Sequence, residues 1–114
     1  MQLSSQQYVV LHLRYDISGV SLANVDSQVS QSYACQSGCD VTELNWPSHV
    51  TADRDNFVFV ADRLNNRVVL LSPGLELVRH VELEHEPRRL YLDQVVTRRL
   101  YVGHVLGGIV VIQV

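Results

Sequence analysis

Two short apolar segments of this sequence do not alternate with polar residues, and this limits the folds open to the chain. Residues 57–61 read Phe-Val-Phe-Val-Ala and residues 68–71 read Val-Val-Leu-Leu, with a polar loop between them. A strand with one face in solvent alternates apolar and polar residues, whereas a strand covered on both faces is apolar throughout. The two segments therefore predict an antiparallel hairpin with protein packed against both of its faces.

Composition and charge narrow the class of protein. The chain has 114 residues, 46% apolar and 18% charged, which suits one globular domain. Its net charge of −3 gives no overall attraction to nucleic acid or to an anionic membrane. No apolar stretch approaches the roughly 20 residues of a spanning helix, and residues 1–10 lack the pattern of a signal peptide. We therefore expect a cytoplasmic protein without membrane contact.

The chain divides into short β-type segments separated by turn-forming residues. Residues 1–25 hold two such segments, which we expect to be outer strands of a partial sheet. Residues 26–46 are polar without a clear period and read as a connecting loop. Residues 47–86 hold four β-type segments and residues 87–114 hold three. Because no segment has a sustained period of about 3.6 residues, we expect little helix.

The last two of these parts repeat each other. Pro47 opens one copy and Pro87 opens the other, 40 residues later. With two extra residues in the second turn, the matched positions are Val50 with Leu90, Ala52 with Leu92, Asp53 with Asp93, Phe59-Val60 with Tyr101-Val102, and Val68-Val69 with Val110-Val111. A period of this size with about four strands is typical of a β-propeller blade. A β-sandwich hairpin is the alternative, but its strands alternate more cleanly.

Residues 47–71 resemble an NHL repeat, the unit of six-bladed NHL propellers. The matching positions are Pro47, Val50, Asp53, Asn56, Val58, Val60, Ala61, Asp62, Asn65, Arg67 and Val68. The second copy is degenerate, because His104, Gly107 and Ile109 stand where Asp62, Asn65 and Arg67 stand in the first. The resemblance implies an all-β, incomplete β-propeller of about two four-stranded antiparallel blades: a complete blade at 47–86 and an incomplete one at 87–114.

The resemblance also implies a non-catalytic interaction module whose loops bind a protein partner. The candidate binding residues lie in the loops and blade starts at one end of the blades: Asp62, Arg63, Asn65, Asn66, Arg67, Arg88, Arg89 and His104. Asp62, Asn65 and Arg67 have a second interpretation, in which they shape the loop and hold neighbouring sheets together.

RNA is the alternative partner. Residues 87–99 hold Arg88, Arg89, Arg98 and Arg99 against Asp93, a local charge of +3. With Tyr91 and Tyr101 nearby, these arginines offer phosphate contacts and stacking surfaces, as in some tripartite-motif NHL proteins. In the competing interpretation they are solvated residues at opposite ends of the sheet.

A metal-dependent lyase or hydrolase is the enzymatic alternative. NHL-like lyases bind zinc through histidines from several blades, and His49 and His104 fall near such positions. Because a catalytic zinc needs about three protein ligands, we expect no catalytic residue, no metal and no cofactor. The pair Cys35 and Cys39, in "CQSGC", stays open between free thiols, a disulfide and half of a metal site.

Two outer strands, one complete blade and one incomplete blade leave strand edges and one sheet face without a neighbour. Either the chain belongs to a longer propeller, or copies of it assemble. In the second case, three chains of about two blades each complete a six-bladed ring. Residues 8–25 of one chain would then add outer strands to the incomplete blade of its neighbour.

Overall fold

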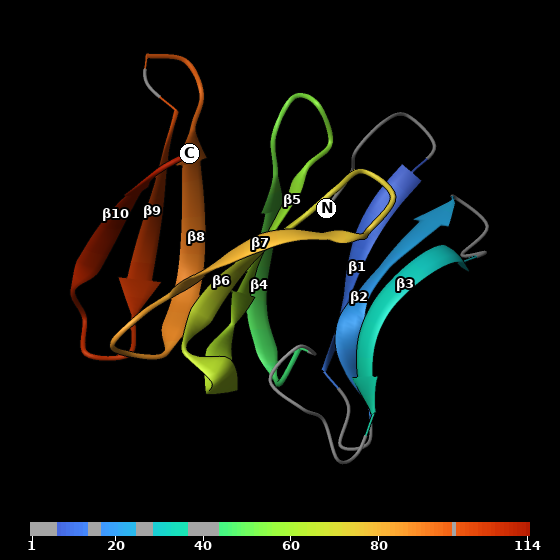
Figure 1. The fold of residues 1–114 in the computed structure, drawn as a ribbon, viewed down its shortest axis with the longest axis horizontal. Coiled ribbons are helices and arrows are strands. Elements are labelled where there is room, and N and C mark those ends of the chain that lie inside the picture. Colours follow the sequence, from blue (N-terminus) through green and yellow to red (C-terminus); the bar gives the residue numbers. More distant parts are fainter. Residues whose placement is uncertain (1–6, 14–16, 25–28, 37–43, 97) are drawn as a thin grey trace.

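The computed structural model describes residues 7–13, 17–24, 29–36, 44–96 and 98–114, with side chains from residue 44 onward (Figure 1). These residues form three antiparallel sheets, so the prediction of an all-β chain is confirmed. Within each sheet, strands adjacent in sequence are adjacent in space. The strands are β1 (Gln7–Leu13), β2 (Ile17–Asn24), β3 (Val29–Gln36), β4 (Pro47–Ala52), β5 (Val58–Asp62), β6 (Arg67–Leu71), β7 (Leu77–Glu82), β8 (Pro87–Asp93), β9 (Arg99–His104) and β10 (Ile109–Gln113), with one 3-10 turn at Arg63–Asn65.

The three sheets stand side by side, each beside the next along the chain (Figure 1). The first strand of the four-stranded sheet, β4, lies beside β1 on one side and beside β8 on the other. The first strands of the three sheets are therefore neighbours.

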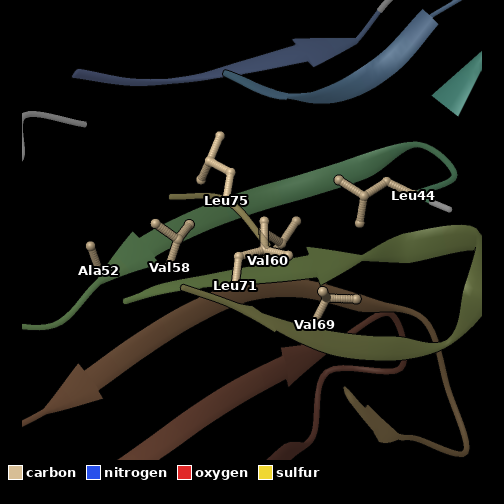
Figure 2. Packing of buried hydrophobic residues seen from close by; sticks show 7 residues of the cluster. All are labelled: Leu44, Ala52, Val58, Val60, Val69, Leu71 and Leu75. Carbon is tan, nitrogen blue, oxygen red and sulfur yellow. The ribbon is translucent and has the colours of Figure 1, made fainter. Parts of the chain in front are cut away.

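Both faces of the β5–β6 hairpin are covered, as the lack of alternation predicts. On one face, Val58 and Val60 join a buried cluster with Leu44, Ala52, Val69, Leu71 and Leu75, on the side that faces the first sheet (Figure 2). On the other face, Phe59 and Ala61 join Val68, Leu90, Leu100 and Val102, packed against the third sheet. Burial of a side chain of this size stabilises a fold by about 1.5–3 kcal/mol.

The internal repeat is visible in the strand pairing. Pro47 pairs with Asp62 and Pro87 pairs with His104, and a bulge follows each proline in the same place. The turn after each first strand begins with an aspartate whose Oδ1 accepts the backbone N–H two residues ahead, at 2.8 Å for Asp53 and 3.1 Å for Asp93. The two segments therefore share one backbone plan.

The predicted matching of β10 with β6 is wrong by one residue. The structure pairs Val60 with Val69 and, at the equivalent positions, Val102 with Val110. Val110 thus corresponds to Val69 rather than Val68. In the same register Gly108, not Ile109, stands in the place of Arg67, because the loop before β10 is one residue shorter than the loop before β6. A slip of one residue moves every side chain to the opposite face.

The prediction for the first 46 residues is wrong in two respects. Residues 29–36 are a strand, β3, paired with β2, although 26–46 was predicted to be a connecting loop. Its serine and glutamine residues resemble those of a loop, and its apolar residues Val29, Tyr33, Ala34 and Cys35 do not alternate regularly with polar ones. The strands in 1–25 are also not outer strands, because β1 lies next to β4 and β3 is the far strand of the first sheet.

Polar contacts join the second sheet to the third at both ends. At one end, the Ser48 hydroxyl donates to the Pro87 carbonyl oxygen at 2.9 Å. At the other end, the backbone N–H of Arg54 donates to Gln94 Oε1 at 2.9 Å. Arg98 Nη2 donates to Asp53 Oδ2 at 3.2 Å; this ion pair is half-exposed on the arginine side, so its net contribution is small. These contacts fix the register between the two sheets.

Candidate interaction site at one end of the sheets

A buried ion pair forms the base of the loop between β5 and β6. Arg67 Nε donates to Asp62 Oδ2 at 2.6 Å, and both side chains are buried. The same carboxylate accepts the Asn65 amide at 2.9 Å and, through Oδ1, the backbone N–H of Asn45 at 2.7 Å. Asp62 thereby connects the loop, strand β6 and the segment that precedes β4. Of the two interpretations, this geometry supports loop shaping for Asp62 and Arg67, because buried side chains have no surface to offer a partner.

The rest of this loop is a short turn with a fixed end. Arg63–Asn65 form the 3-10 turn, and Asn66 follows in the left-handed region at φ 49°, which asparagine tolerates better than most residues. The Asn66 carbonyl accepts the N–H of Leu83 at 2.7 Å, which connects the loop to the segment after β7. Among the candidate binding residues of this loop, Asn66 is exposed and Arg63 and Asn65 are half-buried.

The equivalent loop between β9 and β10 is built differently. His104 stands where Asp62 stands, and its Nδ1 accepts the N–H of Leu106 at 3.2 Å. Gly107 takes φ 87°, and a Cβ at Gly108 would collide with the His104 ring. His85, which precedes Pro87 as Asn45 precedes Pro47, places its ring 5.1 Å from that of His104. A histidine pair thus replaces the hydrogen bond between Asn45 and Asp62.

Both loops and both sheet starts lie at the same end of the molecule (Figure 1). Arg88 and Arg89, at the start of β8, are exposed there. A hollow of about 380 Å³ opens at this end, lined by Glu82, Leu83, Glu84, His85, His104 and Val110. The structure thus brings most of the candidate residues to one end of two sheets. Arg98 and Arg99 are at the opposite end, since Arg99 pairs with Asp93 and Arg89 pairs with Gly103.

Sequence reasoning missed the exposed leucines of these loops. Leu64 is 43% exposed, and Leu106, at the equivalent position two residues after His104, is 70% exposed. Neither was among the candidate residues. The sequence does contain a signal for them. When Asp62 is matched with His104, a leucine stands two residues later in both polar loops.

His49 connects the second and third sheets near this end. Its Nδ1 accepts a hydrogen bond from the backbone N–H of Leu90 at 3.0 Å, so this nitrogen carries no proton. Burial lowers the pKa of His49 below its ordinary value of 6.5, and the positive charge of Arg89 lowers it further. The histidine is therefore held neutral as an acceptor for the neighbouring sheet.

This arrangement predicts a loss of stability in mild acid. The folded state binds the His49 proton more weakly than the unfolded chain, so the contribution of His49 is complete above pH 6.5 and is lost as the pH falls through the lowered pKa. Urea unfolding measured on both sides of pH 6.5 checks this. His49→Gln keeps an acceptor without a titrating group, and we expect its stability to vary less with pH. An identical pH dependence in this variant would contradict the assignment.

The enzymatic alternative requires a metal site. Within the described part of the chain, no three His, Cys, Asp or Glu side chains are grouped closely enough to hold a metal ion. His49 and His104, the zinc candidates, each use Nδ1 to accept a backbone N–H. Among the described residues no helix could cross a membrane. The side chains of Cys35 and Cys39 lie outside the described part.

No protein-family model and no curated protein matches this sequence. Among solved structures, the chain is similar to a protein of unknown function from Bacteroides caccae, whose crystal structure was determined at 1.35 Å resolution. The TM-score is 0.58 and the sequence identity is 12%, and the similar region covers 94% of this chain and 42% of that protein. The chain thus spans less than half of that protein's length. At this identity the similarity concerns the fold alone.

Proposed function

We propose that the chain is part of an NHL-type β-propeller and that it acts as a non-catalytic module that binds a protein partner. Two observations support the propeller. The three sheets stand side by side with their first strands adjacent, and the second and third sheets repeat the same strand pairing. The binding surface is the end of the sheets that carries the β5–β6 and β9–β10 loops. We call this end the loop rim and define it by Leu64, Asn66, Arg88, Arg89 and Leu106.

The observation that carries this proposal is the exposure of leucine at equivalent positions of two loops whose bases are fixed. Leu64 lies between Asp62 and Arg67, whose side chains form the buried ion pair, and the backbone N–H of Leu106 donates to His104 Nδ1. A large apolar side chain on a fixed loop loses little conformational freedom when a partner covers it. Most of the free energy gained by burying it therefore favours binding. Apolar anchors surrounded by polar side chains are typical of protein–protein contacts.

The partner-binding proposal predicts that charge at the loop rim abolishes binding. Immobilised wild-type protein should retain a specific partner from an extract of its own cells, and Leu64→Arg and Leu106→Arg should each lose it. Val78→Arg is the matched control, because Val78 is also an exposed apolar residue but lies on β7. Retention of the same partner by both rim variants would contradict the proposal.

RNA binding is less well supported by this geometry. Arg89 and Arg99 flank the tyrosine pair from opposite ends of the sheet, and Asp93 is the strand partner of Arg99. The positive charge is thus divided between two ends rather than gathered along one path for a phosphate backbone.

A further inference from the structure

The third sheet has one covered face and one open face. Leu90, Leu100 and Val102 point toward the second sheet and are buried. Strand alternation places Tyr91, Tyr101 and Val111 on the opposite face, where they are direct cross-strand partners. Tyr91 is 67% exposed, and the rings of Tyr91 and Tyr101 lie 6.2 Å apart. Together with the exposed Ile109, these residues define what we call the open face.

The equivalent face of the second sheet is closed. Phe59 takes the place of Tyr101, and Leu70 takes that of Val111. Phe59 is 2% exposed because the third sheet covers it. The third sheet therefore shows how the Phe59 face of the second sheet is covered. Among the described residues, nothing covers the equivalent open face of the third sheet.

The order of the sheets indicates which kind of sheet can pack on the open face. Because β1 lies beside β4 and β4 lies beside β8, the next sheet in the series would place its own first strand beside β8. Within one chain, β4 lies on one side of β1. The other side of β1 in a second copy can therefore lie beside β8 of the first copy and continue the series of sheets. Two copies supply six sheets, and each copy's first sheet then covers the open face of the other.

The similar region of the solved structure is part of a longer chain. The 94% of this chain that is similar corresponds to 42% of that protein, so a fold of this kind occurs in a chain more than twice as long. Two copies of the present chain supply a comparable length. We propose that the open face is an interface with a second copy, whose β1–β3 sheet packs on it, and that two copies close a ring of six sheets. This differs from the three-chain ring, one of the two outcomes that the sequence leaves open, because the described residues of each chain form three sheets rather than two.

Light scattering coupled to size-exclusion chromatography tests the proposal. We expect wild-type protein to have twice the 12.9 kDa mass of one chain. Tyr101→Arg and Val111→Lys should each halve the mass and keep a β-type circular dichroism spectrum. Val78→Arg, outside the open face, should leave the dimer intact. A wild-type monomer at the highest soluble concentration would overturn the proposal, as would a dimer that survives both open-face variants.

Hydrogen exchange distinguishes this dimer from a face-to-face one. The proposal predicts that dissociation by Tyr101→Arg speeds amide exchange both in β1 and in β8–β10. Faster exchange confined to β8–β10 would indicate that two open faces pack on each other, which contradicts the proposal. A monomer that binds single-stranded RNA through Tyr101, with an affinity that falls steeply with salt, would also contradict it. The loop-rim variants Leu64→Arg and Leu106→Arg should remain dimeric, so a failure of partner binding and a failure of dimerisation are separable.

Discussion

Replacing Phe59 with alanine should lower the free energy of unfolding by about 3–5 kcal/mol. Phe59 is buried between the second and third sheets, in a cluster with Leu100 and Val102, and its removal leaves a cavity lined by both sheets. Because natural domains are stable by only about 5–15 kcal/mol, this loss removes a large fraction of the total stability. Urea unfolding followed by circular dichroism measures the change.

Tyr101→Ala is the matched control for Phe59→Ala, because the two residues occupy the same position in their sheets. Tyr101 lies on the open face, so in dilute solution we expect a loss well below that of Phe59→Ala. If a second copy covers the open face, the loss caused by Tyr101→Ala should grow with protein concentration, whereas that caused by Phe59→Ala should not. Equal losses for both variants in dilute solution would contradict the assignment of the faces.

Removing the carboxylate of Asp62 should be about as damaging. Asp62→Ala leaves the buried guanidinium of Arg67 without its carboxylate, a change that costs about 3–5 kcal/mol for buried pairs. It also removes the acceptor of the Asn45 N–H and of the Asn65 amide. We expect a large fall in the urea midpoint, and faster proteolysis of the loop at 63–66 in the fraction that stays folded.

His104→Ala is the control for Asp62→Ala. His104 occupies the equivalent position but makes no buried ion pair, since Gly108 stands where Arg67 would be. We expect its replacement to cost roughly 1 kcal/mol, the usual contribution of one hydrogen bond. If both replacements cost the same, the ion pair does not stabilise the loop.

The central hairpin could be predicted because its pattern has a single physical cause. An uninterrupted apolar strand needs cover on both faces, and the structure places Val58 and Val60 on one side and Phe59 and Ala61 on the other. The strand β3 escaped prediction because its serine and glutamine residues are typical of a loop and its few apolar residues do not alternate regularly.

The position of the candidate residues at one end of the sheets could be predicted, but the burial of each side chain could not. The sequence placed Asp62, Arg67 and His104 at one end of the sheets, and the structure does so as well. It did not distinguish the buried Asp62–Arg67 base from the exposed leucines, because burial depends on the segments before β4 and after β7 that close around the loop. The register of β10 could not be predicted from the sequence either. The β9–β10 loop is one residue shorter than the β5–β6 loop, and this difference becomes visible only when the strands are paired.

In this fold the third sheet covers the Phe59 face of the second. Nuclear Overhauser effects between the Phe59 ring protons and the methyl groups of Leu100 test this most directly, because the two residues line the same narrow gap between the sheets. Strong cross-peaks from Phe59 to Leu100 are predicted, and none from Phe59 to the Tyr101 ring. If Phe59 lacks cross-peaks to Leu100 and its ring exchanges magnetisation with water instead, the sheets do not stack in this way.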